Sequence, residues 1–336
     1  THIKNDNKII GGFFMLNNLS EFKDGMENQV FLMVKNCSKD VARNGSEFQK
    51  AIVVDLSGKE YGMMIFQNLI NFTKPVVLKA TVRCSLYKNA LSFDMLSSEE
   101  TTDYKLVDFI PSGNVDVKDT WQKLMSYVGK LSSSEKMLIC EILKEHQNKF
   151  VSMPLDIQGA FSYKSGLLDA TYKLTKHAYE YALEEGLDTN LVIISSILYY
   201  IGKVKTISDA MTYEPLDVLI NAGVTSYTMI ENKAKELRAR DDANIDNDEN
   251  KDGTKEAHSK FDIDDETLRM IYHIILCQNK SVISGIPEAV VLKMINKINL
   301  EVEGMKMNLK GSENGIVNST NTYAKRLYAR KKEKDK

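Results

Sequence analysis

The chain has 336 residues, long enough for two domains or even three, and its 43% hydrophobic and 27% charged residues are ordinary for a globular protein. The net charge of -2 provides no global field that attracts nucleic acid, so any such binding has to use a local basic patch. Four cysteines lie far apart without a CxxC pair, which argues against a zinc site or a disulfide framework. No apolar run reaches the roughly 18 residues of a membrane span, and THIKNDNKII lacks a signal-peptide core, so we expect a cytoplasmic protein with no membrane partner.

Residues 1–27 are expected to form a polar N-terminal extension. Its one apolar stretch, Ile9–Leu16, would pack on a partner or on the next domain, and a stray edge strand is the alternative. Residues 28–100 then alternate as strands do: Val30, Leu32 and Val34 share one face. The five expected strands are residues 30–35, 48–56, 59–66, 75–84 and 91–96, with tight turns at Asn44-Gly45 and Ser57-Gly58. Five short strands in about 70 residues predict a small Greek-key β-barrel of the OB-fold type.

The predicted barrel offers cations and aromatic residues that we expect on its surface. They are Lys35, Lys39, Arg43, Lys50, Tyr61, Phe66, Lys79, Arg83, Tyr87 and Lys88. A groove of cations with aromatic platforms binds single-stranded nucleic acid through phosphate contacts and base stacking. The same residue types also occur on any solvated barrel, which is the alternative interpretation.

From Asp103 onward the apolar period is helical. Residues 101–150 are expected to be a helical linker with helices Val117–Lys130 and Ser133–Asn148, the second capped by Ser132 and Glu135. Residues 151–305 are expected to form an all-α domain. Its predicted helices are residues 162–185, 189–201, 215–239, 264–278 and 287–305.

Two charged segments interrupt or follow these helices. Arg240–Gly253 has six acids against two bases and is expected to be a flexible acidic insertion over residues 240–258. Its Asp248–Gly253 stretch imitates the start of a calcium loop, but position 12 of such a loop would be Ser259, which cannot supply the bidentate carboxylate. Residues 306–336 form a basic tail that would serve as an electrostatic arm or as a solvated helix end; its cations include Lys325, Arg326, Arg330, Lys331 and Lys332.

Several stretches carry a resemblance to a known family. In the barrel they are NQVFLMVKN (Asn28–Asn36), VVDLSGKEYGMMIF (Val53–Phe66) and PVVLKATV (Pro75–Val82). In the helical part they are SGLLDATYKL (Ser165–Leu174), ILYYIGKVKTIS (Ile197–Ser208), IYHIILCQNK (Ile271–Lys280) and PEAVVLKMINKINLEVEGM (Pro287–Met305). Their order resembles the bacterial YhaM family of 3′–5′ exoribonucleases, which join an OB-fold module to an HD-type metal-dependent phosphohydrolase domain. The resemblance implies an HD-type domain over residues 151–305.

The resemblance also implies where metal ligands would lie. The family uses His and Asp side chains to hold metals that activate water for attack on phosphorus. Its ligand positions fall at Ala170, Tyr199, Tyr200, Ala222, Gln278, Asn279 and Asn296, with Asn299 in place of a nearby second aspartate. None of these residue types holds a catalytic metal as His or Asp does. We therefore expect a degenerate HD domain with no metal, no cofactor and only a vestigial pocket.

The remaining residues near that pocket have two interpretations each. Tyr199 and Tyr200 would either stack on a base or fill the space of a lost metal cluster. Lys203 and Lys205 would bind phosphate, or would favour the helix C-terminus as cations do. His273 would be a structural histidine or a remnant beside the former site.

The sequence thus predicts a non-catalytic protein that binds single-stranded RNA or DNA and whose HD part mediates homo-oligomerisation or docks a protein partner. It would act in a bacterial cytoplasm, including that of the host if a phage or plasmid encodes it. One alternative is an active 3′–5′ exonuclease with unrecognised ligands such as Asp169, Asp209 or Asp217. Another is a scaffold or nucleotide sensor that uses the vestigial pocket. No GxSxG or Walker-type motif points to other chemistry.

Overall fold

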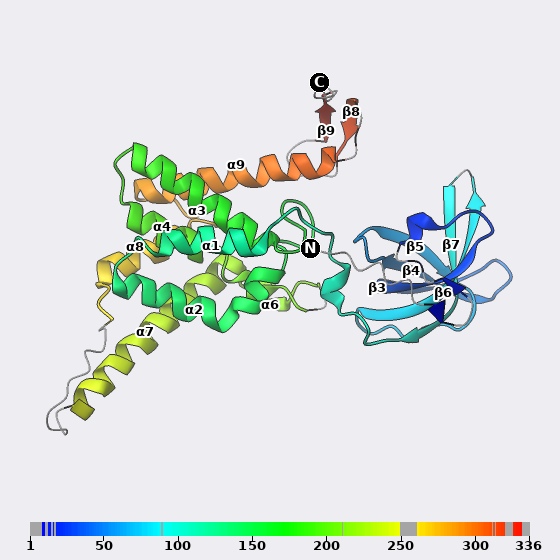
Figure 1. The fold of residues 1–336 in the computed structure, drawn as a ribbon, viewed down its shortest axis with the longest axis horizontal. Helices are drawn as coiled ribbons and strands as arrows, with labels where there is room; N and C mark the ends of the chain where they lie inside the picture. The colour runs from blue at the N-terminus through cyan, green and yellow to red at the C-terminus, as the bar shows by residue number, and fades with distance from the viewer. Residues whose placement is uncertain are drawn as a thin grey trace. The chain divides into compact units, whose positions relative to one another are not determined.

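A computed structural model describes residues 9–10, 13–14, 16, 18–88, 90–209, 211–248, 261–310, 312, 314–319 and 325–330. The chain divides into two compact units. The barrel unit comprises residues 1–112 with Asp209–Met211, and the helical unit comprises residues 113–208 and 212–336 (Figure 1). Among the described helices, none is long and apolar enough to cross a membrane.

Five strands of the barrel unit form the predicted closed barrel. They are β3 (Glu27–Val41), β4 (Glu47–Val54), β5 (Glu60–Ile65), β6 (Val76–Tyr87) and β7 (Ala90–Glu100). The barrel order is β3-β4-β5-β7-β6, and β3 and β6 close it. All neighbouring pairs are antiparallel except β5 and β7, which are parallel. A five-stranded closed barrel with this single parallel pairing has the topology of an OB-fold, so the predicted fold class is confirmed.

Strand β3 has apolar residues on both faces because each face packs against a hydrophobic core. Val30, Leu32 and Val34 point into the barrel and are fully buried. On the opposite face Phe31 and Met33 pack with Phe109 of the 3-10 helix η2 (Leu106–Phe109) in a second, smaller core. The predicted alternation of this strand is therefore confirmed.

The described part of the N-terminal extension packs on the barrel. Strands β1 (Ile9–Ile10) and β2 (Phe13–Phe14) pair with each other, and Leu16 forms a bridge with Val30. After the 3-10 helix η1 (Leu19–Glu21), Leu19 and Phe22 enter the barrel core. The extension thus supplies apolar side chains to the barrel that it precedes.

The turn between β4 and β5 requires glycine at position 58. Gly58 has φ of +80°, and a Cβ there would lie 2.4 Å from backbone atoms of Pro111. Asp55 completes the turn because its carboxylate accepts hydrogen bonds from the backbone N–H groups of Ser57 (3.0 Å) and Leu19 (2.9 Å).

The helical unit has one continuous core. Its longer helices are α1 (Val117–Val128), α2 (Ser133–Ser152), α3 (Gly166–Glu184), α4 (Thr189–Leu198), α7 (Ala222–Asp248), α8 (Asp265–Leu276) and α9 (Pro287–Leu309). The helices of the predicted linker, α1 and α2, contribute Leu124, Leu138 and Phe150 to the same core as α3 and α4. The predicted capping box of α2 is present, with the Ser132 N–H donating to Glu135 Oε2 at 2.8 Å.

One predicted helix is wrong, because residues 215–239 form two helices instead of one. The short α6 (Pro215–Leu219) ends before Asn221, which has φ of +66°. The Asn221 side chain accepts a hydrogen bond from the Val224 N–H at 3.0 Å, as an N-capping residue does, so α7 starts anew at Ala222. A further short helix, α5 (Lys203–Thr206), follows α4.

The acidic segment also differs from its prediction where it is described. Helix α7 continues through Arg240 to Asp248, and residues 249–260, which hold the rest of the predicted insertion, lie outside the described residues. A segment can be polar on every side and still be helical, so a high content of charged residues does not by itself identify a loop.

Helix α9 extends into the tail as far as Leu309, and the described residues after it include two strands in place of the predicted solvated helix end. Strands β8 (Gly315–Asn318) and β9 (Arg326–Ala329) pair in an antiparallel hairpin, so the second unit is not purely α-helical. Leu327 and Ala329 are buried, whereas Lys325, Arg326 and Arg330 are exposed. Lys331 and Lys332 lie outside the described residues.

Candidate functional site

The barrel carries a groove of about 590 Å³ on the outer surface of β4 and β5. Its walls come from β3, β4, β5 and the hairpin between β6 and β7. The lining residues are Asn36, Ser38, Lys50, Ala51, Ile52, Gly62, Met63, Met64, Tyr87, Ala90, Leu91, Ser92 and Phe93. We call this surface, together with Phe48 and Phe66 beside it, the barrel groove.

Strand alternation explains which side chains reach the groove. In β4 the residues Gln49, Ala51 and Val53 point into the barrel, so Phe48, Lys50 and Ile52 point outward. The register then sets Lys50 opposite Met64 and Ile52 opposite Gly62 of β5. A Cβ at Gly62 would meet no atom within 4 Å, so the groove floor is open at this position.

Aromatic rings border the groove. The rings of Phe48 and Phe66 are stacked, with centroids 5.6 Å apart and planes inclined by 24°. Phe66 is 54% exposed and Tyr87, on the hairpin, is 64% exposed. The ammonium groups of Lys50 and Lys88 lie over the rings of Phe48 and Tyr87, at 5.4 Å and 5.3 Å from the centroids.

Most of the predicted surface cations of the barrel are neutralised by carboxylates. Lys50 pairs with Asp40 at 2.5 Å, Lys79 with Glu99 at 3.6 Å and Arg83 with Glu27 at 3.1 Å, and Lys35 pairs with Glu60. The hydrogen bond from Lys50 lowers the pKa of Asp40 below its usual range, so this carboxylate stays charged at neutral pH. Lys39, Arg43 and Lys88 make no ion pair with any described residue, and we call these three the unpaired cations.

The structure brings only some of the predicted residues together. Lys50 and Tyr87 line the groove, while Phe66 and Lys88 lie at its border. Tyr61 instead points inward and packs edge-to-face on Phe93, 5.5 Å between centroids. The remaining cations lie on β3 and the turn after it (Lys35, Lys39, Arg43) and on β6 (Lys79, Arg83).

The apolar part of the groove was not predicted from the sequence. Phe48, Ile52, Met64 and Leu91 were not singled out, although the strand predicted over residues 48–56 already placed Phe48 and Ile52 on the same face as Lys50. That alternation is the signal that would have found them.

In the helical unit, four of the positions assigned by the family resemblance converge. Tyr199 and Tyr200 follow α4, are 1% and 6% exposed, and lie ring edge to ring face with centroids 5.2 Å apart. The Tyr200 hydroxyl hydrogen-bonds Asn296 of α9, and Gln278 Nε2 donates to the Tyr199 carbonyl at 2.6 Å. Burial raises the pKa of Tyr199 above its ordinary range, so the phenol stays neutral.

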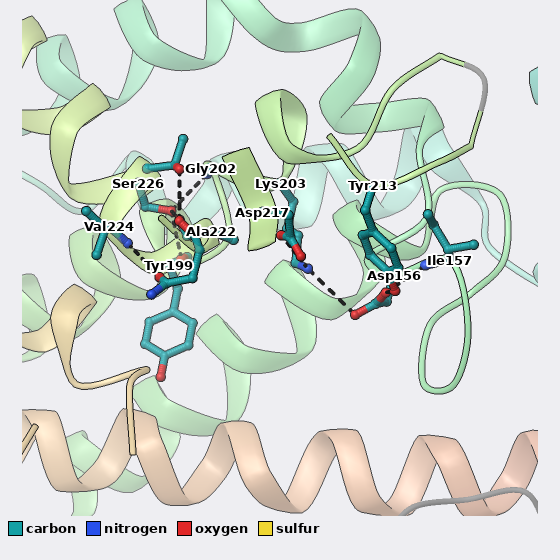
Figure 2. Close-up of polar contacts among 12 residues, drawn as sticks. Asp156, Ile157, Tyr199, Gly202, Lys203, Tyr213, Asp217, Ala222, Val224 and Ser226 are labelled. Atoms are coloured by element: carbon teal, nitrogen blue, oxygen red, sulfur yellow. Dashed lines mark hydrogen bonds and ion pairs between the residues drawn. The ribbon is translucent and has the colours of Figure 1, made fainter. Parts of the chain in front are cut away.

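The turn after these tyrosines is fixed by a close approach to α7 (Figure 2). Ser226 Oγ accepts from the Gly202 N–H at 2.8 Å. A Cβ on Gly202 would lie 2.2 Å from the carbonyl oxygen of Ala222, so only glycine fits. Ala222 is thus a backbone contact of this turn.

Lys203 on the same turn is held by two carboxylates (Figure 2). Its Nζ lies 3.6 Å from both Asp156 Oδ2 and Asp217 Oδ1 and 5.9 Å from the centroid of the Tyr213 ring. This arrangement satisfies the charge of Lys203 internally.

The other positions from the resemblance have separate surroundings. Ala170 is buried in the core, and Asn299 Oδ1 lies 2.9 Å from His177 Nδ1. Asn279 closes the turn after α8 by accepting from the Ser281 N–H at 3.0 Å. His273 Nε2 accepts from the Gly285 N–H at 2.8 Å. Lys205 lies at a different depression, lined also by His146 and Lys149.

Within the described residues, no group of three His, Cys, Asp or Glu side chains is arranged to hold a metal ion. Two of the carboxylates proposed as ligands in the nuclease alternative, Asp169 and Asp217, have different partners. Asp169 accepts from Tyr163 at 2.6 Å and from Lys173 at 2.8 Å, and Asp217 lies beside Lys203.

Comparison with known proteins adds little to this description. No protein-family model matches the chain. Two crystal structures of the mitochondrial single-stranded DNA-binding protein Rim1 from S. cerevisiae are similar to 24% and 23% of this chain and are covered over 97% and 96% of their own length. The sequence identities are 11% and 10% and the TM-scores are 0.20 and 0.19, so the OB-fold rests on the strand topology above.

Proposed function

We propose that the barrel groove binds single-stranded nucleic acid. The observation that carries the proposal is the stacked Phe48–Phe66 pair beside an open groove on β4 and β5. The corresponding second and third strands of an OB-fold form the surface on which oligonucleotides bind. Exposed aromatic rings stack on bases, and any base has a π-face, so such a groove favours single strands without strong sequence preference.

The charges support a stacking-dominated mode of binding. Four of the seven predicted surface cations pair with carboxylates, which leaves the unpaired cations for phosphate contacts. Lys88 lies on the hairpin that borders the groove. A strand would then lie with its bases on the aromatic and apolar side chains and with few phosphates neutralised.

The helical unit is, in this proposal, a degenerate HD domain that performs no hydrolysis. The support is the residue types at the positions that the YhaM resemblance assigns to metal ligands. Both tyrosines are buried there, the Tyr200 hydroxyl hydrogen-bonds Asn296, and Gln278 donates to the backbone carbonyl of Tyr199. Neutral groups of this kind bind catalytic metals poorly. Such a body would serve to assemble copies of the chain or to dock another protein.

The experiment incubates the purified chain with labelled RNA and DNA 20-mers in Mg²⁺ or Mn²⁺, measuring anisotropy and strand length in the same samples. We expect binding with intact oligonucleotides. The variant Gly62→Leu adds a side chain to the groove floor at a position where a Cβ meets no atom within 4 Å, and it should abolish binding while leaving the thermal unfolding midpoint nearly unchanged.

Other outcomes separate the alternatives. Shortening from the 3′ end that a chelator abolishes would refute the non-catalytic proposal. Absence of both binding and cleavage would refute the nucleic-acid proposal and leave a scaffold for protein partners.

A further inference from the structure

A second depression, of about 520 Å³, lies in the helical unit between α2, α5 and α6. Its lining residues are His146, Lys149, Val204, Lys205, Ile207, Glu214, Pro215 and Leu216. None of them belongs to the barrel groove or to the Tyr199–Tyr200 cluster. A volume of this order is typical of pockets for small molecules.

Three nitrogen-bearing side chains converge on this depression from two helices. His146 and Lys149 are three residues apart on α2 and therefore share one face of it, and Lys205 reaches the site from α5. His146 and Lys205 also line an adjoining cavity of about 140 Å³, together with Lys233, Glu145 and Glu236. The depression itself thus gathers basic groups from helices α2 and α5.

Lys205 differs from its neighbours in the helical unit because no described residue forms an ion pair with it. Lys203 lies between Asp156 and Asp217, and Lys233 is neutralised by Glu145 and Glu236, both at 2.5 Å. Lys205 is exposed on the wall of the depression. An ammonium group in this situation has its donors free for an anionic ligand.

The local potential agrees with this view. Burial lowers the pKa of His146, and Lys205 lowers it further, with smaller effects of Lys149 and Lys233 in the same direction. Glu145 opposes them, but its carboxylate already accepts from Lys233. The acid that lines the depression itself is Glu214, at the start of α6.

The other walls are apolar. Val204 and Ile207 are buried beneath the site, and Pro215 and Leu216 form its rim. This combination of basic side chains and apolar walls matches an organic phosphate, whose anionic group would meet the basic side chains and whose less polar part would meet the walls.

We propose that this depression binds the phosphate group of a nucleotide, with Lys205, Lys149 and His146 around the anion. The phosphate would come from a free mononucleotide or from the phosphorylated end of a strand. The site is independent of the barrel groove, so it does not rest on the proposed function.

The test is calorimetric titration of the full chain with inorganic phosphate, adenosine monophosphate, and a 20-mer with and without a 5′-phosphate. All titrations are repeated in the Gly62→Leu background, where the barrel groove is filled, so that the barrel does not contribute. We expect saturable binding of the phosphate-bearing probes. Preference for the mononucleotide or for the phosphorylated 20-mer identifies the source of the phosphate.

Variant Lys205→Met should weaken phosphate binding about tenfold or more, because a charge-assisted hydrogen bond is lost. The matched control is Lys144→Met, which removes the same charge from an exposed position of α2 outside the depression and should bind as the wild type does. Bound phosphate should also raise the pKa of His146, followed by NMR with His146→Gln to assign the signal. No saturable binding of any phosphate-bearing probe, or equal weakening in both lysine variants, would overturn the proposal.

Discussion

Truncation of Phe66 tests the stacking argument most directly. Phe66 directly follows β5, is 54% exposed, and stacks on Phe48 with centroids 5.6 Å apart. One base stacked on an aromatic side chain contributes about 1–3 kcal/mol. We therefore expect Phe66→Ala to raise the Kd for a single-stranded 20-mer by about 5- to 150-fold.

Stability should change much less than affinity. The ring is more than half exposed, and an aromatic pair contributes about 0.5–1.5 kcal/mol beyond its burial. The assay is fluorescence anisotropy at fixed salt, with the urea midpoint as a folding control. Tyr181→Ala is the matched control, because it truncates a 46% exposed aromatic ring on α3 of the helical unit. Equal affinities of the two variants would refute the stacking argument.

Three further predictions concern salt, packing and pH. Each phosphate contact on a single strand contributes about -0.7 to the slope of log K against log salt, so the three unpaired cations predict a slope of about -2; one of about -4 or steeper would mean that other cations take part. Gly202→Ala should destabilise the helical unit by about 1–3 kcal/mol, because its Cβ would lie 2.2 Å from the Ala222 carbonyl oxygen, and an unchanged unfolding midpoint would contradict that packing. The hydrogen bond from Lys233 lowers the pKa of Glu145 below its ordinary 4.5. The pair therefore stabilises the folded state above about pH 4.5, and this contribution is lost as the pH falls through the lowered pKa. The urea midpoint of Lys233→Met should therefore fall less than that of the wild type on acidification from about pH 5 to about pH 3, and parallel curves would show that the pair does not contribute.

The barrel strands could be predicted because the signals that define them lie within short stretches of sequence. Alternation in single strands and the Asn44-Gly45 and Ser57-Gly58 turns define five strands without knowledge of their partners. The same rule, applied to β5, places Tyr61 with Met63 and Ile65 on the inner face. Tyr61 was chosen as a surface platform for its residue type, which is a weaker indicator than its strand parity.

The ion pairs of the barrel surface could not be predicted because their partners lie far apart in the sequence. Lys35 meets Glu60, 25 residues away, and Arg83 meets Glu27, 56 residues away. Such pairs depend on strand order and register, which a list of cations does not contain. The hairpin of β8 and β9 was missed for a related reason, since four-residue strands in a polar segment are too short for a periodic signal.

The packing of Tyr199 and Tyr200 indicates which changes a metal site at this position of the helical unit would require. A metal centre is a polar cavity whose ligands are held apart by the ion, whereas these rings pack against each other and are almost fully buried. Replacing one tyrosine by histidine would supply a single ligand, remove apolar volume from a packed core, and leave Gln278 and Asn296 as neutral partners. Each single step towards a metal site would thus cost stability before any metal could bind. Under the proposal, the cluster is a packed core that stabilises the helical unit.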